Sequence, residues 1–508
     1  MRTELTLPAD ARLLRLVQDY VLALAELAGI PPDQAQPLAQ GVWEACHHCI
    51  ACDFDADDTG AFTVAGELTP AALTLSVCDR GLPFDPNSET AVEQAAGSED
   101  PSTVSLRGHG LSVVHQCADE VRYINHGPEG NELRFTKNLS GVCRLDPPPS
   151  TPPSSYREPT PQGHSQDYTI RLLQPADAIR VAQLMYRVYG YSYSNEDFYY
   201  PERLAHDLET GRHVGVVAVA DNSEIVGHVG VERPDLGPLA ELGQLAVAPA
   251  HRGQGLKKLM GDRLQEEVSR LGLAGLYGEA VTIHPISQES SEGRGLQVGG
   301  IKLLDWQARF KQLPSLHPGL EPETAPQRET MVFYFKYLSP PAPARVCAPS
   351  RHQEIVAKIY ANLKTPYEFV EPCGPIGRGQ LSVHYDRDTG AGTIQVNRIG
   401  IDTLPEIYQA RRDLCNIAGA AVVGLFLPLA QGGTSYLCEA AEEDGFFLSG
   451  VWPLFAPDGD FLRLQYLNAE LDLERVRLFS PFAQELLAYI LREKERVRQG
   501  ITGERDTT

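Results

Sequence analysis

The sequence lacks any long uninterrupted hydrophobic segment. Its longest apolar run, at about residues 418–427, is too short to cross a bilayer and is typical of a buried strand. The chain starts MRTELTLPAD, with no apolar stretch behind a basic start as a signal peptide would need. We therefore expect no membrane partner and a soluble, cytoplasmic protein.

Basic residues are also scarce. The 508 residues include 44 Lys and Arg against 67 Asp and Glu, which gives a net charge of −23. Nucleic-acid binding depends on clustered Lys and Arg, so the sequence indicates no nucleic-acid partner. The 10 cysteines are spread too thinly to form a disulfide framework.

Two proline-rich stretches divide the chain, whose length suits about three domains. The Pro and Ser density between the first two domains is typical of an extended spacer without a core. The shorter stretch lies at 340–343. These stretches predict a first domain at 1–142, a linker at 143–167, a second domain at 168–338, a third at 345–498 and a disordered tail at 499–508.

A glycine-rich turn stands between an apolar strand and a helix in LAVAPAHRGQGLKKLM, residues 245–260. Glycines let backbone N–H groups approach a ligand closely, and a helix N-terminus behind them adds donors and a positive dipole end. The turn, Arg252-Gly253-Gln254-Gly255, therefore suits a pyrophosphate.

This segment resembles motif A of the GNAT acetyltransferases, Arg/Gln-x-x-Gly-x-Gly/Ala. Arg252 and Gly255 fit the pattern, while Lys257 replaces its last small residue and either adds charge near a phosphate or crowds the turn. The resemblance implies an acetyl-CoA site. Its expected cofactor-binding residues are Leu245, Val247, Arg252, Gly253, Gln254, Gly255, Leu256 and Lys257.

The order of elements around this turn is also that of a GNAT fold. The patterns predict strands at 169–173, 214–220, 224–231, 242–247, 276–284 and 331–337, and helices after Pro175, at 259–271 and at about 295–310. The match covers about 168–338.

Acyl transfer to an amine needs a base, and the strand at 276–284 has the best candidates. Glu279 suits a general base if burial raises its pKa, His284 titrates in a suitable range, and Tyr277 could act as the acid. Strict alternation puts Glu279 and His284 on opposite faces. Each has a structural alternative: Glu279 in an ion pair with a nearby arginine, and His284 capping the turn at Pro285.

Tyrosines are concentrated from the end of the helix after Pro175 up to the strand predicted at 214–220. They either line a pocket for the acceptor or pack against each other. The set comprises Tyr186, Tyr189, Tyr191, Tyr193, Tyr199 and Tyr200.

The first domain carries a second recognisable pattern, Asp79-x-Gly81-x-Pro-Phe-Asp-Pro, followed by Gly108-x-Gly110-Leu111. With the helices before them, these resemble the GHKL ATP-binding domain, most closely that of anti-sigma-factor serine kinases. The resemblance implies that Asp79 accepts from the adenine amino group, that Gly81 lets the base pack closely, and that the second turn meets phosphate. Residues 87–106 would be a lid.

One position departs from that family. Its helix carries Glu-x-x-x-Asn, in which the asparagine holds Mg²⁺; here Glu44 is present but His48 replaces the asparagine. Magnesium prefers oxygen ligands, so ATP binding is expected while phosphoryl transfer is not. The alternative is a GHKL fold kept as an interaction module without nucleotide.

The same helix offers a competing metal hypothesis. Cys46, Cys49 and Cys52 have the spacing C-x₂-C-x₂-C, which could begin a zinc or iron–sulfur site. No second cysteine pair follows, and cysteine is a frequent small core residue, so structural cysteines are the preferred interpretation.

The third domain has a similar order of helices and strands but no Arg-x-x-Gly-x-Gly turn. It resembles a degenerate second GNAT lobe. The predicted fold class is therefore α/β and α+β multidomain, with a GHKL α/β sandwich followed by two GNAT-like mixed-sheet lobes.

The resulting hypothesis is an acetyl-CoA-dependent N-acetyltransferase regulated by an ATP-binding module. The alternative is a partner-switching regulator, resembling anti-sigma factors, whose GNAT lobes are ligand sensors. Expected partners are a small-molecule or protein amine acceptor, and a sigma factor or an antagonist of the anti-sigma type. The resemblance also suggests a homodimer.

Overall fold

The computed structural model describes residues 1–50, 60–69, 71–83, 117–139, 168–193, 195–221, 223–306, 328–387, 389–469 and 476–505. They form two compact units, Met1–Val229 with Leu245–Arg263, and Gly230–Gln244 with Leu264–Thr508. The chain passes between the units inside two strands and one helix, so the units do not follow the predicted domain boundaries, which stay a prediction.

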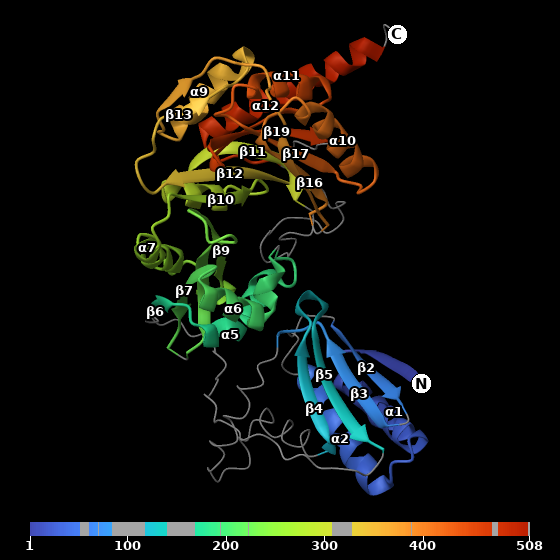
Figure 1. Cartoon of the computed structure of the whole chain (residues 1–508). Helices are drawn as coiled ribbons and strands as arrows, with labels where there is room; N and C mark the ends of the chain where they lie inside the picture. Colours follow the sequence, from blue (N-terminus) through green and yellow to red (C-terminus); the bar gives the residue numbers. More distant parts are fainter. Residues whose placement is uncertain are drawn as a thin grey trace. The chain divides into compact units, whose positions relative to one another are not determined.

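The N-terminal part of the first unit is a sheet with two helices on one face (Figure 1). The strands pair antiparallel in the order β1-β2-β3-β5-β4. The elements are β1 (Arg2–Pro8), α1 (Leu14–Leu27), α2 (Pro32–His48), β2 (Ala61–Leu68), β3 (Ala72–Asp79), β4 (Glu120–Asn125) and β5 (Asn131–Asn138). The buried stripe of α1 comprises Leu14, Val17, Val21, Leu24 and Ala25, whereas Leu16 and Leu27 of the same helix are exposed.

The rest of the first unit contains the strand order β9-β8-β7-β6. Its elements, of which three run on into the second unit, are β6 (Thr169–Leu172), α5 (Ala178–Tyr189), α6 (Pro201–Thr210), β7 (His213–Val219), β8 (Ile225–Glu232), β9 (Leu239–Val247) and α7 (Leu256–Val268).

The second unit has the strand order β15-β16-β17-β19-β18-β11-β12-β10-β9. A separate parallel pair joins β13 (Ala344–Val346) to β14 (Tyr367–Phe369). The other elements are β10 (Gly275–Val281), α8 (Ile286–Gly293), β11 (Gln297–Trp306), β12 (Glu329–Tyr337), α9 (Gln353–Asn362), β15 (Gln380–Asp386), β16 (Ala391–Arg398), α10 (Thr403–Asn416), β17 (Val422–Pro428), α11 (Thr434–Glu443), β18 (Phe447–Ala456), β19 (Gly459–Leu467) and α12 (Pro481–Arg505).

The strand pairing in this unit repeats. β9 runs parallel to β10, which is followed by antiparallel β12 and β11, and β16 runs parallel to β17, which is followed by antiparallel β19 and β18. The halves meet at the pair Gly300–Gly450. A Cβ on Gly300 would lie 2.5 Å from the Trp452 ring, and one on Gly450 2.3 Å from the Gly300 Cα, so the junction needs both glycines.

Two sequence expectations are wrong. The segment predicted as a helix at 295–310 forms strand β11 over Gln297–Trp306. Val298, Ile301 and Leu304 are three apart, as on a helix, but a register shift after Lys302 and a φ of 54° at Leu304 break the strand alternation instead. The expected disordered tail at 499–508 is helical to Arg505, because α12 continues beyond residue 498.

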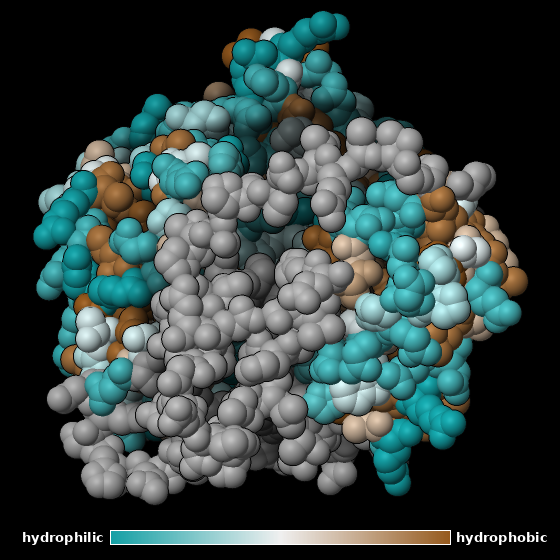
Figure 2. Space-filling model, turned by 90° about the horizontal axis from the view of Figure 1, so that it is seen from below, coloured by the Kyte–Doolittle hydropathy of each residue, from teal (hydrophilic) through white to brown (hydrophobic). Residues whose placement is uncertain are grey.

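No helix in the described part of the chain is long and apolar enough to cross a membrane. On the face shown in Figure 2, hydrophobic residues are scattered among hydrophilic ones wherever the chain is described.

Candidate functional site

The predicted pyrophosphate turn has the backbone of an anion cradle. Gly253 and Gly255 have φ values of 77° and 74°, and a Cβ on either would meet nothing within 4 Å. Residues 252–255 are exposed. The amides of Lys258 and Leu259 donate to the Gly255 carbonyl, so the first turn of α7 opens at Gly255. Pyrophosphate binding by residues 252–257 stays a prediction.

Carbonyls of β9 before this turn are already engaged. Tyr189 Oη donates to the Leu245 oxygen at 2.5 Å, and Arg252 Nε donates to the Val247 oxygen at 3.2 Å. Arg252 thus braces the turn against the strand that precedes it. Pairing of a cofactor to Leu245 and Val247 stays a prediction.

N-terminal to the glycine turn, the backbone ladder that pairs β9 with β10 is short. It covers three residue pairs and ends where Glu241 faces Tyr277. Gln244, three residues on, has a φ of 54°, a left-handed conformation in the middle of a strand. Leu242–Gln244 therefore lie outside the β9–β10 ladder, next to a carboxylate.

Glu279 on β10 is held in an ion pair. Lys302 Nζ lies 2.9 Å from each carboxylate oxygen of Glu279, and Trp306 Nε1 donates to Oε2 at 3.3 Å. Lys302 also pairs with Asp305, which pairs with Arg463. The ion-pair alternative for Glu279 thus holds, with lysine as the partner.

Glu241 is the functional candidate that the sequence reading missed. Desolvation raises the pKa of its carboxyl to about 8, helped by the negative charges of Glu279 and Glu232, while Lys302 opposes the shift. Burial, with Glu241 and Glu279 nearby, also raises the pKa of Tyr277. The signal in the sequence was a lone acidic residue in the apolar stretch LAELGQLAV before the glycine turn.

His284 does not share this strand. β10 ends at Val281, and His284 lies in the turn before α8, where Gln288 Nε2 donates to its carbonyl oxygen at 3.4 Å. The opposite-face argument for Glu279 and His284 therefore does not apply, because a turn separates them.

Asp79 lies at the end of β3, where its carboxylate accepts hydrogen bonds from several donors. Its Oδ1 accepts from the Gly81 amide at 2.7 Å and from Asn131 Nδ2 at 3.0 Å, and Cys49 Sγ donates to Oδ2 at 3.6 Å. Burial raises the pKa of the Asp79 carboxyl, against these bonds and the charge of His48. Asn131, which faces Asp79 across β3 and β5, was not predicted. Asp79 and Gly81 are thus placed together as expected.

Family models match two parts of the chain: the histidine kinase-like ATPase domain over residues 7–137, and the acetyltransferase (GNAT) family over residues 179–280. The chain joins a histidine kinase-like ATPase domain to a GNAT acetyltransferase domain.

Individual proteins are similar to parts of the chain. Serine-protein kinase RsbW of Bacillus subtilis (strain 168) is 27% identical over 142 residues, covering 27% of this chain and 86% of RsbW. The structure of ribosomal-protein-S18-alanine N-acetyltransferase from Escherichia coli matches with 16% identity over 35% of this chain and 97% of its own, with a TM-score of 0.27. Phosphinothricin acetyltransferase from Sinorhizobium meliloti, solved in complex with AcCoA, matches with 18% identity over 34% and 89%, with a TM-score of 0.26.

The ATPase domain fits adenine better than Mg²⁺. Asp79 offers a buried carboxylate acceptor beside a glycine amide. On α2, Glu44 accepts from Gln40 Nε2 at 2.8 Å, and four residues on His48 supplies nitrogen rather than the oxygen that Mg²⁺ prefers. We therefore derive no step through Mg²⁺. Gly108, Gly110, Leu111 and the predicted lid lie outside the described residues.

The cysteines of α2 are packed in the core of the ATPase domain. Cys46 and Cys49 are buried, and burial raises the pKa of the Cys46 thiol, which disfavours the thiolate that a metal needs. Cys52 lies outside the described residues. The structural interpretation of Cys46 and Cys49 is therefore favoured.

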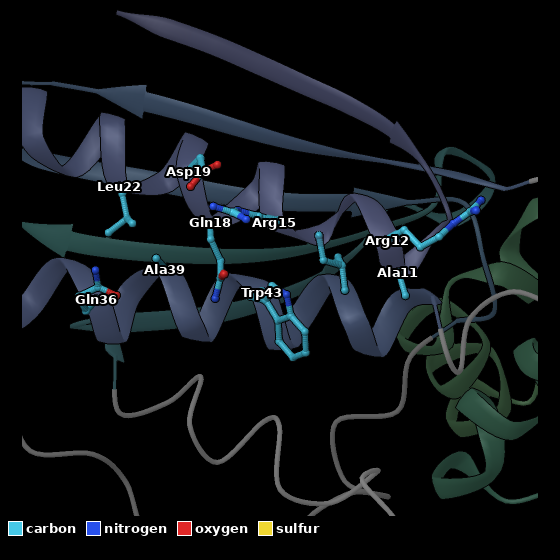
Figure 3. A pocket seen from close by; sticks show the side chains of 10 residues that line it. Ala11, Arg12, Arg15, Gln18, Asp19, Leu22, Gln36, Ala39 and Trp43 are labelled. Carbon is cyan, nitrogen blue, oxygen red and sulfur yellow. The ribbon is translucent and has the colours of Figure 1, made fainter.

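A groove of about 480 Å³ lies between α1 and α2 of the ATPase domain (Figure 3). Arg12, Arg15 and Trp43 are among its lining residues. Neither Asp79 nor Gly81 lines it, so it is separate from the predicted adenine site.

Elsewhere in the described chain, His352, Cys438 and Glu442 place potential metal-ligand atoms within 4.8 Å of one another. Glu442 already pairs with His352 at 2.6 Å, with Arg496 at 2.9 Å and with Arg351 at 3.4 Å. This composition is that of a buried ion-pair network.

The tyrosine cluster of the GNAT domain is packed, and Tyr186, Tyr191 and Tyr200 also bond the ATPase domain. Tyr191 stacks edge-on against Tyr186 and Tyr199, with ring centroids 5.0 and 5.1 Å apart. Tyr191 Oη donates to the Gly81 oxygen at 2.8 Å, and Tyr200 Oη donates to the His126 oxygen at 2.9 Å. The packing alternative therefore describes several of these tyrosines, and the predicted acceptor pocket stays a prediction.

Proposed function

We propose that this chain transfers an acetyl group from acetyl-CoA to a primary amine by direct attack, with Glu241 as the general base. The main support is the position of Glu241 at the end of the β9–β10 ladder in the GNAT domain, together with the raised pKa of its carboxyl, about 8. A base is most effective when its pKa is near the working pH, and an ordinary glutamate is far too acidic.

Bound acetyl-CoA would supply a thioester carbonyl. Glu241 would accept a proton from the attacking amine as the C–N bond forms and the C–S bond breaks, and the protonated Glu241 would return this proton to the departing CoA thiolate, directly or through solvent. Glu279, held by Lys302 and Trp306, is better suited to set the charge around Glu241 than to exchange protons itself. The catalytic roles expected of Glu279, His284 and Tyr277 stay predictions.

The experiment begins with isothermal titration of the full-length protein with acetyl-CoA. Acetyl transfer is then followed by release of free thiol, with polyamines, peptide amino termini and a lysine peptide as acceptors. Glu241→Gln should lower the rate by about two orders of magnitude or more with acetyl-CoA affinity retained. Glu289→Gln, at an exposed position of α8, is the matched control. Unchanged transfer in the Glu241 variant would reject this base.

We propose further that ATP in the N-terminal domain regulates this transfer through the loop after β3. Besides the Tyr191 contact, Gln183 Nε2 donates to the Pro83 oxygen at 2.9 Å, and Tyr186 Oη donates to the Arg80 oxygen at 3.4 Å. These bonds join the backbone beside Asp79 to α5 and the tyrosine cluster. A nucleotide that moved this backbone would therefore move the GNAT domain's own contact residues.

The alternative is a partner-switching regulator that captures a sigma factor or its antagonist, with the GNAT lobe as a ligand sensor. The observation in its favour is the similarity of the first domain to a serine-protein kinase, combined with His48 at the position expected for asparagine. A second titration of the full-length protein with ATP separates the two proposals, because binding of ATP without binding of acetyl-CoA would favour this regulator.

We propose that the C-terminal lobe is a degenerate GNAT lobe that holds no CoA. The β16–β17 ladder extends to Phe426, and the Gln431 amide bonds the backbone of Asn397 and Ile399 at 3.0 and 2.9 Å. The N-terminus of α10 is covered as well, since the Gly379 amide donates to Asp402 Oδ1 at 2.7 Å. These contacts support the proposal that the lobe's own groups take the places of a pantetheine slot and a pyrophosphate cradle.

A further inference from the structure

Arg463 is a buried cation whose ion-pair partner lies in the other repeat. It lies on β19 with 2% of its surface exposed, and its NH2 donates to Asp305 Oδ1 on β11 at 3.0 Å. Its NH1 donates to Ser449 Oγ at 2.8 Å. A buried arginine needs an anion to offset its desolvation, and the anion here is supplied by the other repeat.

The bulge in β11 explains why Asp305 and Lys302 act together. Residues three apart on a regular strand point to opposite faces. Here the left-handed Leu304 and the register shift after Lys302 interrupt the alternation, and Lys302 Nζ pairs with both Asp305 and Glu279. A continuous series of ion pairs therefore runs from Arg463 through Asp305 and Lys302 to Glu279.

Comparison of the two halves shows that the charged residues Glu279, Lys302 and Asp305 have no charged equivalents in the second half. Phe333 pairs with Glu279 and Gly300, and Arg463 pairs with Phe426 and Gly450 in the equivalent positions. Counting from the junction glycines, the equivalents of Lys302 and Asp305 are Trp452 and Phe455. The first half thus has a charged set where the second has aromatic rings, and only the second has an arginine at the crossing position.

Side chains of the C-terminal lobe also hold β11 in place. Gln465 accepts from the Leu303 amide at 3.0 Å and donates to the Leu303 oxygen at 2.8 Å, and Ser449 donates to the Ile301 oxygen at 2.6 Å. The backbones of β11 and β18 pair at one position, Gly300–Gly450. At the bulge, the side-chain bonds just described take the place of further backbone pairing. They fix the strand that carries Lys302 and Asp305.

From these contacts we propose that Arg463 of the C-terminal lobe is a positioning residue for acyl transfer, acting through Asp305 and Lys302 on Glu279 and so on Glu241. The proposal rests on the function proposed above. It gives the C-terminal lobe a role in the chemistry although its own cofactor place is filled.

The charges around Glu241 determine the sign of the effect. Glu279 on β10 and Glu232 on β8 disfavour its carboxylate, and Lys302 on β11 favours it. Asp305 competes with Glu279 for Lys302, and Arg463 relieves that competition by pairing with Asp305. Removing the arginine therefore draws Lys302 toward Asp305 and removes a positive charge, and both changes raise the pKa of Glu241.

The test is a carboxyl-carbon NMR titration of the full chain, with glutamate labelled at the side-chain carboxyl carbon. Glu241→Gln identifies the resonance. Arg463→Met should raise the pKa of Glu241 by roughly half a unit to one unit, whereas Arg463→Lys should leave it near the wild-type value. Arg411→Met, which removes another ion pair of the same lobe, is the control and should not move it.

The outcomes separate this inference from the proposed function. A wild-type pKa in the ordinary range of glutamate would overturn Glu241 as the base and this inference with it. A wild-type pKa near 8 that Arg463→Met leaves unchanged would overturn the inference alone.

If Arg463→Met does not fold, Asp305→Asn tests the same series with the opposite sign. Losing this anion frees Lys302 for Glu279 and should lower the pKa of Glu241 by a similar amount. No shift, or a shift upward, would overturn the inference. In an active variant, the acid limb of the kcat/KM pH profile should move in the same direction as the NMR titration.

Discussion

Glu241→Gln should change how the stability of the second unit depends on pH. The folded pKa of about 8 lies above the ordinary value of 4.5, so the folded state keeps a proton that the unfolded chain has lost. Stability from this group is therefore complete below about pH 4.5 and declines until the pH passes about 8. The difference of roughly 3.5 units corresponds to about 5 kcal/mol at most, and solvent access at a partly exposed group reduces it to about 2–5 kcal/mol.

The glutamine variant lacks this proton, so its free energy of unfolding should not show that decline. Urea unfolding at several values between about pH 5 and pH 8 measures it. The chain has 3 tryptophans, and a Trp43→Phe background leaves Trp306 and Trp452 as reporters of the second unit alone. Glu289→Gln should keep the decline. Parallel pH dependences for the Glu241 variant and its parent would refute a raised pKa.

Four further predictions concern ligands and coupling. Gly255→Val should weaken acetyl-CoA binding about tenfold or more in a titration, because valine disfavours a φ of 74°, whereas Gly272→Ala at another left-handed glycine should not. Asp79→Asn should weaken ATP binding measured with a fluorescent analogue, since an acceptor for the adenine amino group is lost. Equilibrium dialysis should give one CoA per chain, and two would contradict a filled second lobe. Tyr191→Phe with Tyr200→Phe should reduce any effect of ATP on acetyl-CoA affinity; an unchanged effect would place the coupling elsewhere.

Where periodicity and turn chemistry agree, the sequence predicted the fold well. The hairpin of β7 and β8 and the strand-turn-helix at β9 and α7 follow from local patterns and lie where expected. In contrast, β4 and β5 were not predicted. In β5, charged residues such as the ion-paired Glu132 and Arg134 alternate with Leu133 and Phe135, which pack in the core, and this short mixed pattern was not recognised as a strand.

The candidate site was only partly predictable for a different reason. Asp79 with Gly81, and the glycines of the turn, are local motifs, so their geometry follows from adjacent residues. Glu241 depends on charges from β8, β10 and β11, and its raised pKa arises from that tertiary neighbourhood. Because the β11 segment was predicted as a helix, the pairing of Lys302 with Asp305 was not predicted. The bulge brings together residues three apart in the sequence, which is also the spacing of a helix face.

The repeat gives a reason for a second lobe without a cofactor site. If that lobe served only to bury β18 and β19, hydrophobic residues at the crossing position would suffice, as Phe333 does in the first repeat. A buried arginine there is costly unless its anion is also kept, and replacing such pairs with apolar residues is often neutral or stabilising. The charged set Glu279, Lys302, Asp305 and Arg463 therefore has no evident packing advantage over its aromatic counterpart. Its value lies in the field it creates beside Glu241, which is why the charge-preserving Arg463→Lys should keep that field and Arg463→Met should not.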